Sequence, residues 1–356
     1  MRKNAQLIIG LVVSFLALAL AFRGANLGEM ASALRKANYF TLVLGVGLIW
    51  LGLYFRALSW RVILGGKVPY WRVYAAMNEG YLLNNLLPFR LGEFGRAYLI
   101  SQRNNLTAMQ ALSSVVVERV VDLVMDVLLL LIFLPFVVGL DWARGAALSS
   151  IALGVVAVAG LVVVARNRDW ILRRVSAMLR RPRLQWLHPE RWEERLEAFL
   201  SGLAVLQDPR KAIQAATWSG LAWVSAGVAT WLMLRAFLPG ATVTMGFVTL
   251  TGVGLVAAVP SAPGSAGVFE FGVVQILAVF GVEHNLALSF AVVFHASQFA
   301  LVTILGSLAL ASEGETLSHL VQSAQALLSN TSRLRTASTA VPGAPTQSTE
   351  PVAPDR

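Results

Sequence analysis

Ionisable residues stand inside apolar stretches of this 356-residue chain, where charge is costly. The longest series lies in the apolar run 111–138, where Glu118, Asp122 and Asp126 recur every fourth residue and Arg119 follows the first of them. Residues four apart share a helix face, and Arg119 is within pairing reach of Asp122. An ionised group at the centre of a bilayer costs on the order of 3 kcal/mol, which favours inward-facing, paired side chains. The alternative is that Glu118 and Arg119 lie in water near a membrane surface.

A second set of polar residues surrounds an interrupted stretch at Pro88. The set comprises Asn84, Asn85, Arg90, Glu93 and Arg96. Proline lacks a backbone N–H and disfavours helix at the residue before it, so we predict two short helices that meet at a polar break. Irregular backbone at membrane depth persists where protein or a watery cavity surrounds it.

The residue types at this first break suit a phosphate group. Arg90 and Arg96 present planar donor forks that bind phosphate bidentately, and they are also the expected partners of the carboxylates at 118 and 122. Asn84 and Asn85 could hydrogen-bond a glycerol or sugar hydroxyl, or cap helix ends. Glu93 could contact a ligand or form a structural ion pair with an arginine.

A second break spans residues 260–270. Gly264 and Gly267 permit close approach of backbone, and Glu270 is its only charge, with a capping role as the alternative. His295 follows in the last apolar run. A lone membrane histidine is more often a hydrogen-bonding group than a metal ligand, and no other histidine has ligand spacing. We therefore predict no metal, no cofactor and no catalytic residue.

The two breaks resemble each other in sequence. Each has a proline, then a glycine, then the tripeptide Glu-Phe-Gly, which begins at Glu93 in the first and at Glu270 in the second. Paired segments interrupted by glycine and proline in two halves of a chain are typical of transport sites between repeats. Chance similarity of a few residues is the alternative.

The composition indicates a membrane protein. The chain is 56% hydrophobic and 13% charged, against roughly 25% charged residues in soluble domains. Several apolar runs reach the roughly 20 residues that cross a bilayer. We predict an all-α polytopic fold with about seven to eight spanning helices and one or two broken or re-entrant segments. The net charge of +10 is assigned to orientation and anionic lipid rather than to nucleic acid.

The chain divides into a transmembrane domain, 1–311, and a polar tail, 312–356, that is predicted to be largely disordered. The basic loop 166–211 is predicted to be cytoplasmic by the positive-inside rule, together with the N-terminus, in the plasma membrane. The absence of cysteine excludes disulfides and thiolate metal sites.

Three motifs resemble one family in order and spacing. They are Asn84-Asn85-Leu-Leu-Pro88-Phe-Arg90-Leu-Gly92-Glu93-Phe-Gly-Arg96, then Glu118-Arg119-Val-Val-Asp122, then Pro263-Gly264-Ser-Ala-Gly267-Val-Phe-Glu270. Over residues 7–311 the chain resembles the flippase-like, lysylphosphatidylglycerol synthase transmembrane-region family. The resemblance implies a domain that moves a lipid headgroup across a bilayer. It argues against lysyl transfer, because 312–356 is too short and polar for the soluble synthase domain. Ser265-Ala266 and His295 depart from the family pattern and leave the substrate class open.

The leading hypothesis is therefore a protein that binds and translocates a phospholipid or lipid-linked headgroup. Its predicted binding residues are Asn84, Asn85, Arg90, Glu93, Arg96, Glu118, Arg119, Asp122, Gly264, Gly267, Glu270 and His295. The alternatives are an intramembrane transferase that acts on a lipid-linked substrate, and a non-catalytic membrane subunit. The expected partners are the lipid, the membrane and an enzyme that supplies the lipid.

Overall fold

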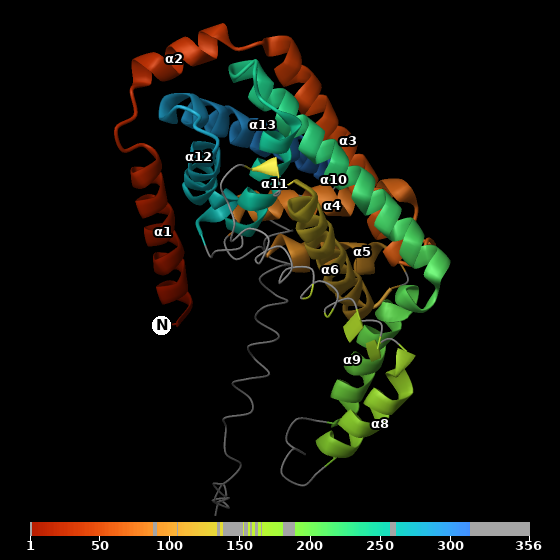
Figure 1. The fold of residues 1–356 in the computed structure, drawn as a ribbon. Coiled ribbons are helices and arrows are strands. Elements are labelled where there is room, and N and C mark those ends of the chain that lie inside the picture. The colour runs from red at the N-terminus through yellow and green to blue at the C-terminus, as the bar shows by residue number, and fades with distance from the viewer. Residues whose placement is uncertain are drawn as a thin grey trace, which may run out of the picture.

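The computed structural model is built from helices (Figure 1). It describes residues 2–87, 91–104, 106–133, 136–137, 166–180, 189–256 and 261–313, with isolated positions between 152 and 164, and none of these residues forms a strand. The predicted all-α, polytopic membrane fold is confirmed. Arg90 and nearly all of the predicted tail lie outside the described residues.

Helices make up most of the described part of the chain. They are α1 Arg2–Ala21, α2 Leu27–Lys36, α3 Tyr39–Ile63, α4 Tyr70–Leu86, α5 Gly92–Arg103, α6 Ala108–Phe133, α8 Arg168–Leu179, α9 Pro189–Gly202, α10 Pro209–Phe237, α11 Val243–Val256, α12 Val268–Val279 and α13 His284–Ser312, with 3₁₀ turns η4 Leu203–Gln207 and η5 Pro263–Ser265. Both predicted breaks separate two short helices, α4 from α5 and α11 from α12.

Several helices begin at a capping side chain. The side chain of Asn38 accepts hydrogen bonds from the backbone N–H groups at the start of α3, and Asp208 does the same for α10, where Pro209 occupies the first helical position. Glu283 caps α13 in the same way. These caps satisfy donors that have no partner within the helix, so the starts of the long helices are set locally.

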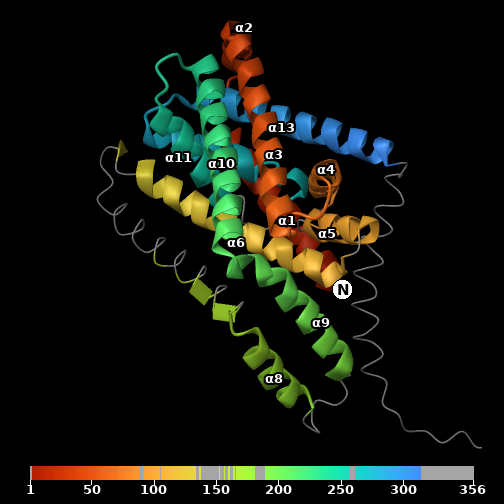
Figure 2. The same cartoon turned by 90° about the vertical axis from the view of Figure 1, so that its right-hand side faces the viewer.

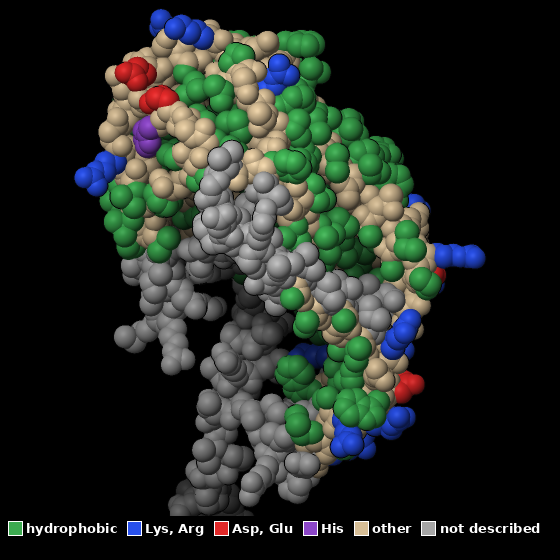
Figure 3. All heavy atoms as spheres, viewed as in Figure 1, with side chains coloured by type: hydrophobic (Ala, Val, Ile, Leu, Met, Phe, Trp, Pro, Cys, Tyr) green, Lys and Arg blue, Asp and Glu red, His purple; other side chains and the backbone are tan. Residues whose placement is uncertain are grey.

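Long apolar helices identify the membrane-crossing part of the fold. In the described part of the chain, α3, α10 and α13 are long and apolar enough to cross a bilayer, and α11 and α12 are shorter apolar helices. Figure 3 shows hydrophobic side chains over α3 and α10, with Lys and Arg gathered near α2 at one end and over α8 and α9 at the other. This distribution is that of a surface in contact with lipid between two aqueous boundaries.

Helices α3 and α10 pack side by side along most of their length (Figure 2). A Cβ added to Gly52 would lie 3.3 Å from the carbonyl oxygen of Ala222, and Ser59 donates a hydrogen bond of 2.9 Å to the carbonyl of Ala215. Residue numbers rise along α3 as they fall along α10, so the two helices are antiparallel. Small residues permit this close approach, as is usual in membranes.

At each break the chain reverses direction, so the two short helices that flank the break form a hairpin. In the first hairpin, Arg72 near the start of α4 donates a hydrogen bond of 3.0 Å to the carbonyl of Arg103 at the end of α5. In the second hairpin, Gly252 of α11 faces Ile276 of α12. Both ends of each hairpin therefore lie on one side of the bundle.

The order of elements α3–α4–α5–α6 recurs as α10–α11–α12–α13, each time as a long helix, a broken hairpin and a long helix. The contacts recur as well, because α4 packs on α13 and α11 packs on α6. Since α3 and α10 are antiparallel, the hairpins that follow them enter the bundle from opposite sides. The sequence similarity of the two breaks thus coincides with an inverted repeat in the structure.

Helices α8 and α9 extend away from the bundle (Figure 1). Two hydrogen bonds of 2.9 Å from Arg180 to Glu193 join them and hold the pKa of the Glu193 carboxyl below its usual range. Trp170 and Trp192 are exposed, and each lies beneath an arginine of its own helix. Exposed tryptophan and arginine are typical of a segment at the membrane–water interface.

Candidate functional site

The three carboxylates of α6 face the interior of the bundle. Glu118, Asp122 and Asp126 are only 2%, 8% and 7% exposed. The four-residue spacing therefore predicted one face of the helix correctly. Arg119 is the most accessible member of the series, with a side chain that is 35% exposed.

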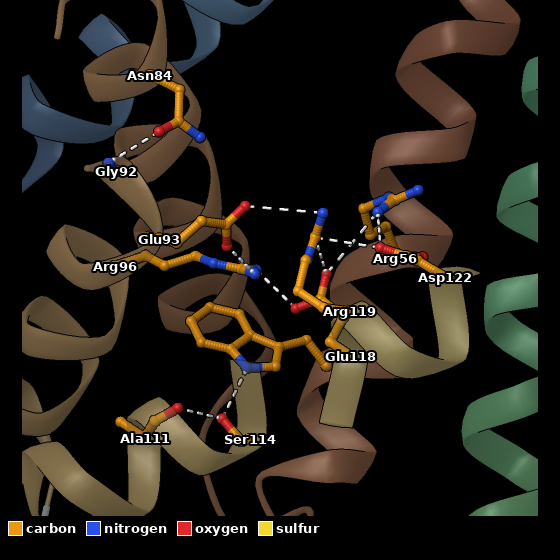
Figure 4. A network of polar contacts seen from close by, with 11 residues as sticks. Arg56, Asn84, Gly92, Glu93, Arg96, Ala111, Ser114, Glu118, Arg119 and Asp122 are labelled. Atoms are coloured by element: carbon orange, nitrogen blue, oxygen red, sulfur yellow. Dashed lines mark hydrogen bonds and ion pairs between the residues drawn. The ribbon is translucent and has the colours of Figure 1, made fainter. Parts of the chain in front are cut away.

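Arginines from α3, α5 and α6 surround two of these carboxylates (Figure 4). Nη1 of Arg96 lies 2.7 Å from Oε2 of Glu118, and Nη1 of Arg56 donates to Oδ2 of Asp122 at 2.6 Å. Nη2 of Arg119 lies 3.1 Å from Oε1 of Glu118 and 3.1 Å from Oδ2 of Asp122. The predicted pairing of Arg119 with Asp122 is present, but the other arginine on Asp122 comes from α3.

Arg96 is enclosed by protein. Its side chain is 1% exposed, it forms an ion pair with Glu93 within α5, and its guanidinium lies 4.6 Å from the ring centroid of Trp60. The Trp60 indole is fixed by a 3.0 Å hydrogen bond to Oγ of Ser114. Arg96 thus forms ion pairs with both Glu93 and Glu118 and has little contact with the cavity, so it positions these two carboxylates.

The six residues form one arginine–carboxylate cluster, with three guanidinium groups and three carboxylates. Its members are Arg56, Glu93, Arg96, Glu118, Arg119 and Asp122. The formal charge of the cluster is zero, which limits the cost of several kcal/mol per ion that burial imposes. Asp126 lies one helical turn beyond, and its Oδ1 has no hydrogen-bond partner among the described residues.

Helix α5 packs closely against α4 in the first hairpin, because Gly80 and Gly92 allow the two backbones to come into contact. A Cβ added to Gly92 would lie 1.8 Å from the carbonyl oxygen of Gly80, so no side chain fits there. Oδ1 of Asn84 accepts a 2.8 Å hydrogen bond from the N–H of Gly92, which is the predicted capping role for one of the two asparagines. Asn85 instead points to α13, where its amide lies 3.3 Å from Oγ1 of Thr303.

The second break is held by a histidine–glutamate pair. Nδ1 of His295 lies 2.6 Å from Oε1 of Glu270, and Nε2 of His295 lies 2.9 Å from the carbonyl oxygen of Gly264. The other oxygen of Glu270 accepts a 2.7 Å hydrogen bond from the N–H of Gly267. Gly264 and Gly267 have φ of +68° and +86°, a left-handed conformation that favours glycine.

A cavity of about 680 Å³ lies between the two breaks, and α3 and α10 contribute to its wall. Of the residues predicted from the sequence, those that line it are Asn84, Asn85, Glu93, Arg119, Gly264 and His295. The predicted residues Arg96, Glu118, Asp122, Gly267 and Glu270 do not line it. Arg90 lies outside the described residues.

The structure adds four polar or aromatic residues that sequence reasoning did not include in the site. Arg56, Tyr81, Trp223 and Gln298 line the same cavity. Trp223 donates a 3.1 Å hydrogen bond to Asp122, and the guanidinium of Arg56 lies 5.9 Å from the Trp223 ring. The position of Arg56 inside an apolar run was the available signal, since such arginines are usually functional.

The cavity wall carries both guanidinium groups and the carboxylate of Glu93. Arg56 and Arg119 present guanidinium donors to the cavity, and guanidinium groups bind phosphate bidentately. Apolar side chains, including Leu53, Phe294 and Phe299, complete the wall. In the part of the chain that the structure describes, His, Asp and Glu side chains form no group that could hold a metal ion.

Comparison with known proteins agrees with this architecture. The family model described as the lysylphosphatidylglycerol synthase transmembrane region matches residues 7–306. A protein named as a UPF0104 membrane protein, from Methanothermobacter thermautotrophicus, is 24% identical over 340 residues, which cover 89% of this chain and 97% of that protein. No solved structure gives a significant match.

Proposed function

The chain belongs to the lysylphosphatidylglycerol synthase transmembrane-region family, and from that premise we propose that it binds the headgroup of a phospholipid or lipid-linked substrate in the cavity and moves it across the bilayer. The observation that carries the proposal is the cavity between the two breaks, with the accessible guanidinium groups of Arg56 and Arg119 in its wall. Its volume of about 680 Å³ falls within the usual range for small-molecule sites, roughly 300–1,000 Å³.

Arg119 is the principal phosphate contact in this proposal. Its side chain is 35% exposed, whereas that of Arg56 is 21% exposed and that of Arg96 is 1% exposed. The ion pairs with Glu118 and Asp122 fix the position of the Arg119 guanidinium before a ligand binds. Binding therefore costs less conformational entropy. Arg96 acts through Glu93 and Glu118 and does not contact the lipid.

The inverted repeat supports transport over simple binding. A site at the junction of two repeats, bounded by broken helices, is the arrangement that many transporters share. Here one broken hairpin contributes Glu93 and Asn84 to the cavity, and the other contributes Gly264 and Ser265. Movement of either hairpin against the α3–α10 pair would change the side from which the cavity is reached.

The experiment measures transbilayer movement of NBD-phosphatidylglycerol in phosphatidylcholine proteoliposomes, with dithionite bleaching as the readout. We expect Arg119→Ala to reduce the protein-dependent rate at least tenfold, because one lost charge-assisted contact is worth roughly 1.5–3 kcal/mol. The matched control is Arg61→Ala on α3, since Arg61 binds the carbonyl of Val68 and does not line the cavity. Equal rates for wild type and Arg119→Ala would contradict the proposal.

A further inference from the structure

His295 of α13 lines the same cavity as Arg56 and Arg119, and Glu270 lies behind it in the second break, outside the arginine–carboxylate cluster. Both side chains are largely buried, at 15% and 9% exposure. Histidine is the side chain whose charge changes most readily near neutral pH. The role of the pair in phosphate binding is limited, because both nitrogens of His295 already face oxygen atoms of the protein.

The geometry around His295 favours hydrogen on both ring nitrogens. A carbonyl oxygen can only accept, so Nε2 of His295, at 2.9 Å from the Gly264 oxygen, carries a hydrogen. A second hydrogen must lie between Nδ1 of His295 and Oε1 of Glu270, which are 2.6 Å apart. A neutral imidazole beside an ionised carboxylate would place two lone pairs against each other at this distance. Both ring nitrogens of His295 therefore face oxygen atoms, an arrangement that suits a pair with one additional proton.

The same two side chains hold the backbone of the break. His295 binds the carbonyl of Gly264, and Glu270 binds the N–H of Gly267. The segment between them lines the cavity through Gly264 and Ser265, and Ser265 also has a positive φ of 60°. Loss of the shared proton would break the 2.6 Å contact and release this backbone. Protonation of the pair would in this way be linked to the position of the cavity wall.

Among the described residues of this wall, the pair is the ionisable unit. Helix α1 faces the break with Ser14, whose Oγ accepts a 2.7 Å hydrogen bond from Ala262, and α11 has no ionisable residue. The Phe269 ring lies 4.5 Å from the His295 ring, and α4 contributes Asn85 and Tyr81 to the cavity. The charged residues that line the rest of the cavity are Arg56, Glu93 and Arg119, and among the described residues none of them contacts the pair.

We propose that His295 and Glu270 form a proton-binding site that couples movement of the lipid headgroup to movement of a proton. This coupling rests on the proposed translocation function. One proton enters from one side, is shared between Nδ1 and Oε1 while the break is closed, and leaves to the other side after the break opens. No bond other than N–H or O–H is made or broken.

The proton site is tested first without transport. In purified protein labelled with ¹⁵N-histidine, the His295 ring signals, assigned by comparison with the Glu270→Gln variant, should show hydrogen on both nitrogens at low pH and on Nε2 alone at high pH. The control is His284→Gln at the start of α13, which should leave this titration unchanged. A His295 signal with one hydrogen throughout the range would overturn the proton site.

Coupling is tested in proteoliposomes with NBD-phosphatidylglycerol and an imposed pH gradient. With one proton per lipid, a gradient of one pH unit should change the leaflet ratio about tenfold for the wild type. Glu270→Gln should remove this response and retain the fold, because the new amide can donate to Nδ1 and still accept from Gly267. Lipid movement that ignores the gradient in the wild type would overturn coupling alone. Absence of any protein-dependent movement would instead overturn the proposed function and coupling together, and the ¹⁵N titration would still decide the proton site.

Discussion

At the scale of single residues, accessibility separates arginines that carry the same charge. Arg96 is surrounded by Glu93, Glu118 and the Trp60 ring, whereas Arg119 keeps part of its guanidinium in the cavity. Burial of a guanidinium requires compensating carboxylates, and these same carboxylates fix the orientation of the exposed one. The buried half of the cluster therefore stabilises the protein and the exposed half is available to a ligand.

This division predicts that Glu118→Gln destabilises the protein strongly. The substitution removes the charge that lies 2.7 Å from Nη1 of Arg96, which is 1% exposed and cannot turn to water. Removal of one partner of a buried ion pair costs about 3–5 kcal/mol. We expect a marked fall in the thermal unfolding temperature of purified protein in detergent, measured by intrinsic tryptophan fluorescence.

The matched control is Asp126→Asn, two helical turns along the same face of α6. Asp126 is 7% exposed, but its Oδ1 has no partner among the described residues and no described cation pairs with it. Loss of this carboxylate should leave stability unchanged or raise it, since an unpaired buried charge is costly. Equal destabilisation by both substitutions would show that the cluster has no special part in stability.

At the scale of elements, the sequence predicted local features better than their assembly. The four-residue spacing in α6 and the proline and glycine positions of both breaks are local patterns, and the structure has the corresponding helix face and hairpins. The pairs Arg56–Asp122 and Glu270–His295 join residues of different helices, 66 and 25 positions apart. No periodicity within one segment specifies such partners. The sequence of α3 alone, in particular, does not identify Asp122 as the partner of Arg56.

The first hairpin depends on glycine at position 92. Gly92→Ala would place a Cβ 1.8 Å from the carbonyl oxygen of Gly80, which is backbone and cannot move aside without separating α4 from α5. We expect destabilisation on the order of 4 kcal/mol, visible as loss of the monodisperse peak in size-exclusion chromatography. Gly47→Ala on α3 meets nothing within 4 Å and should preserve that peak. An intact peak for Gly92→Ala would refute the close packing of α4 and α5.

At the scale of the whole molecule, the two hairpins enter the bundle from opposite sides and meet at one cavity. The antiparallel α3–α10 pair lies between the halves, and α4 on α13 matches α11 on α6. The two halves share one arrangement of helices but differ in chemistry. The first half carries the arginine–carboxylate cluster, and the second half carries the histidine–glutamate pair. A single cavity is thus lined by Arg56 and Arg119 from one half and by His295 from the other.

The arrangement of the whole molecule also bears on which side of the membrane each end of the bundle faces. We propose that the N-terminus and the basic segment 166–211 are cytoplasmic, since α8 and α9 lie on the opposite side of the bundle from α2 (Figure 1). The chain has no cysteine, so single cysteines can be labelled without background. In intact cells, an impermeant maleimide should label Ala31→Cys on α2 and should label Ala177→Cys on α8 only after the membrane is opened. The reverse pattern would invert the orientation while leaving the hairpins on opposite sides of the bilayer.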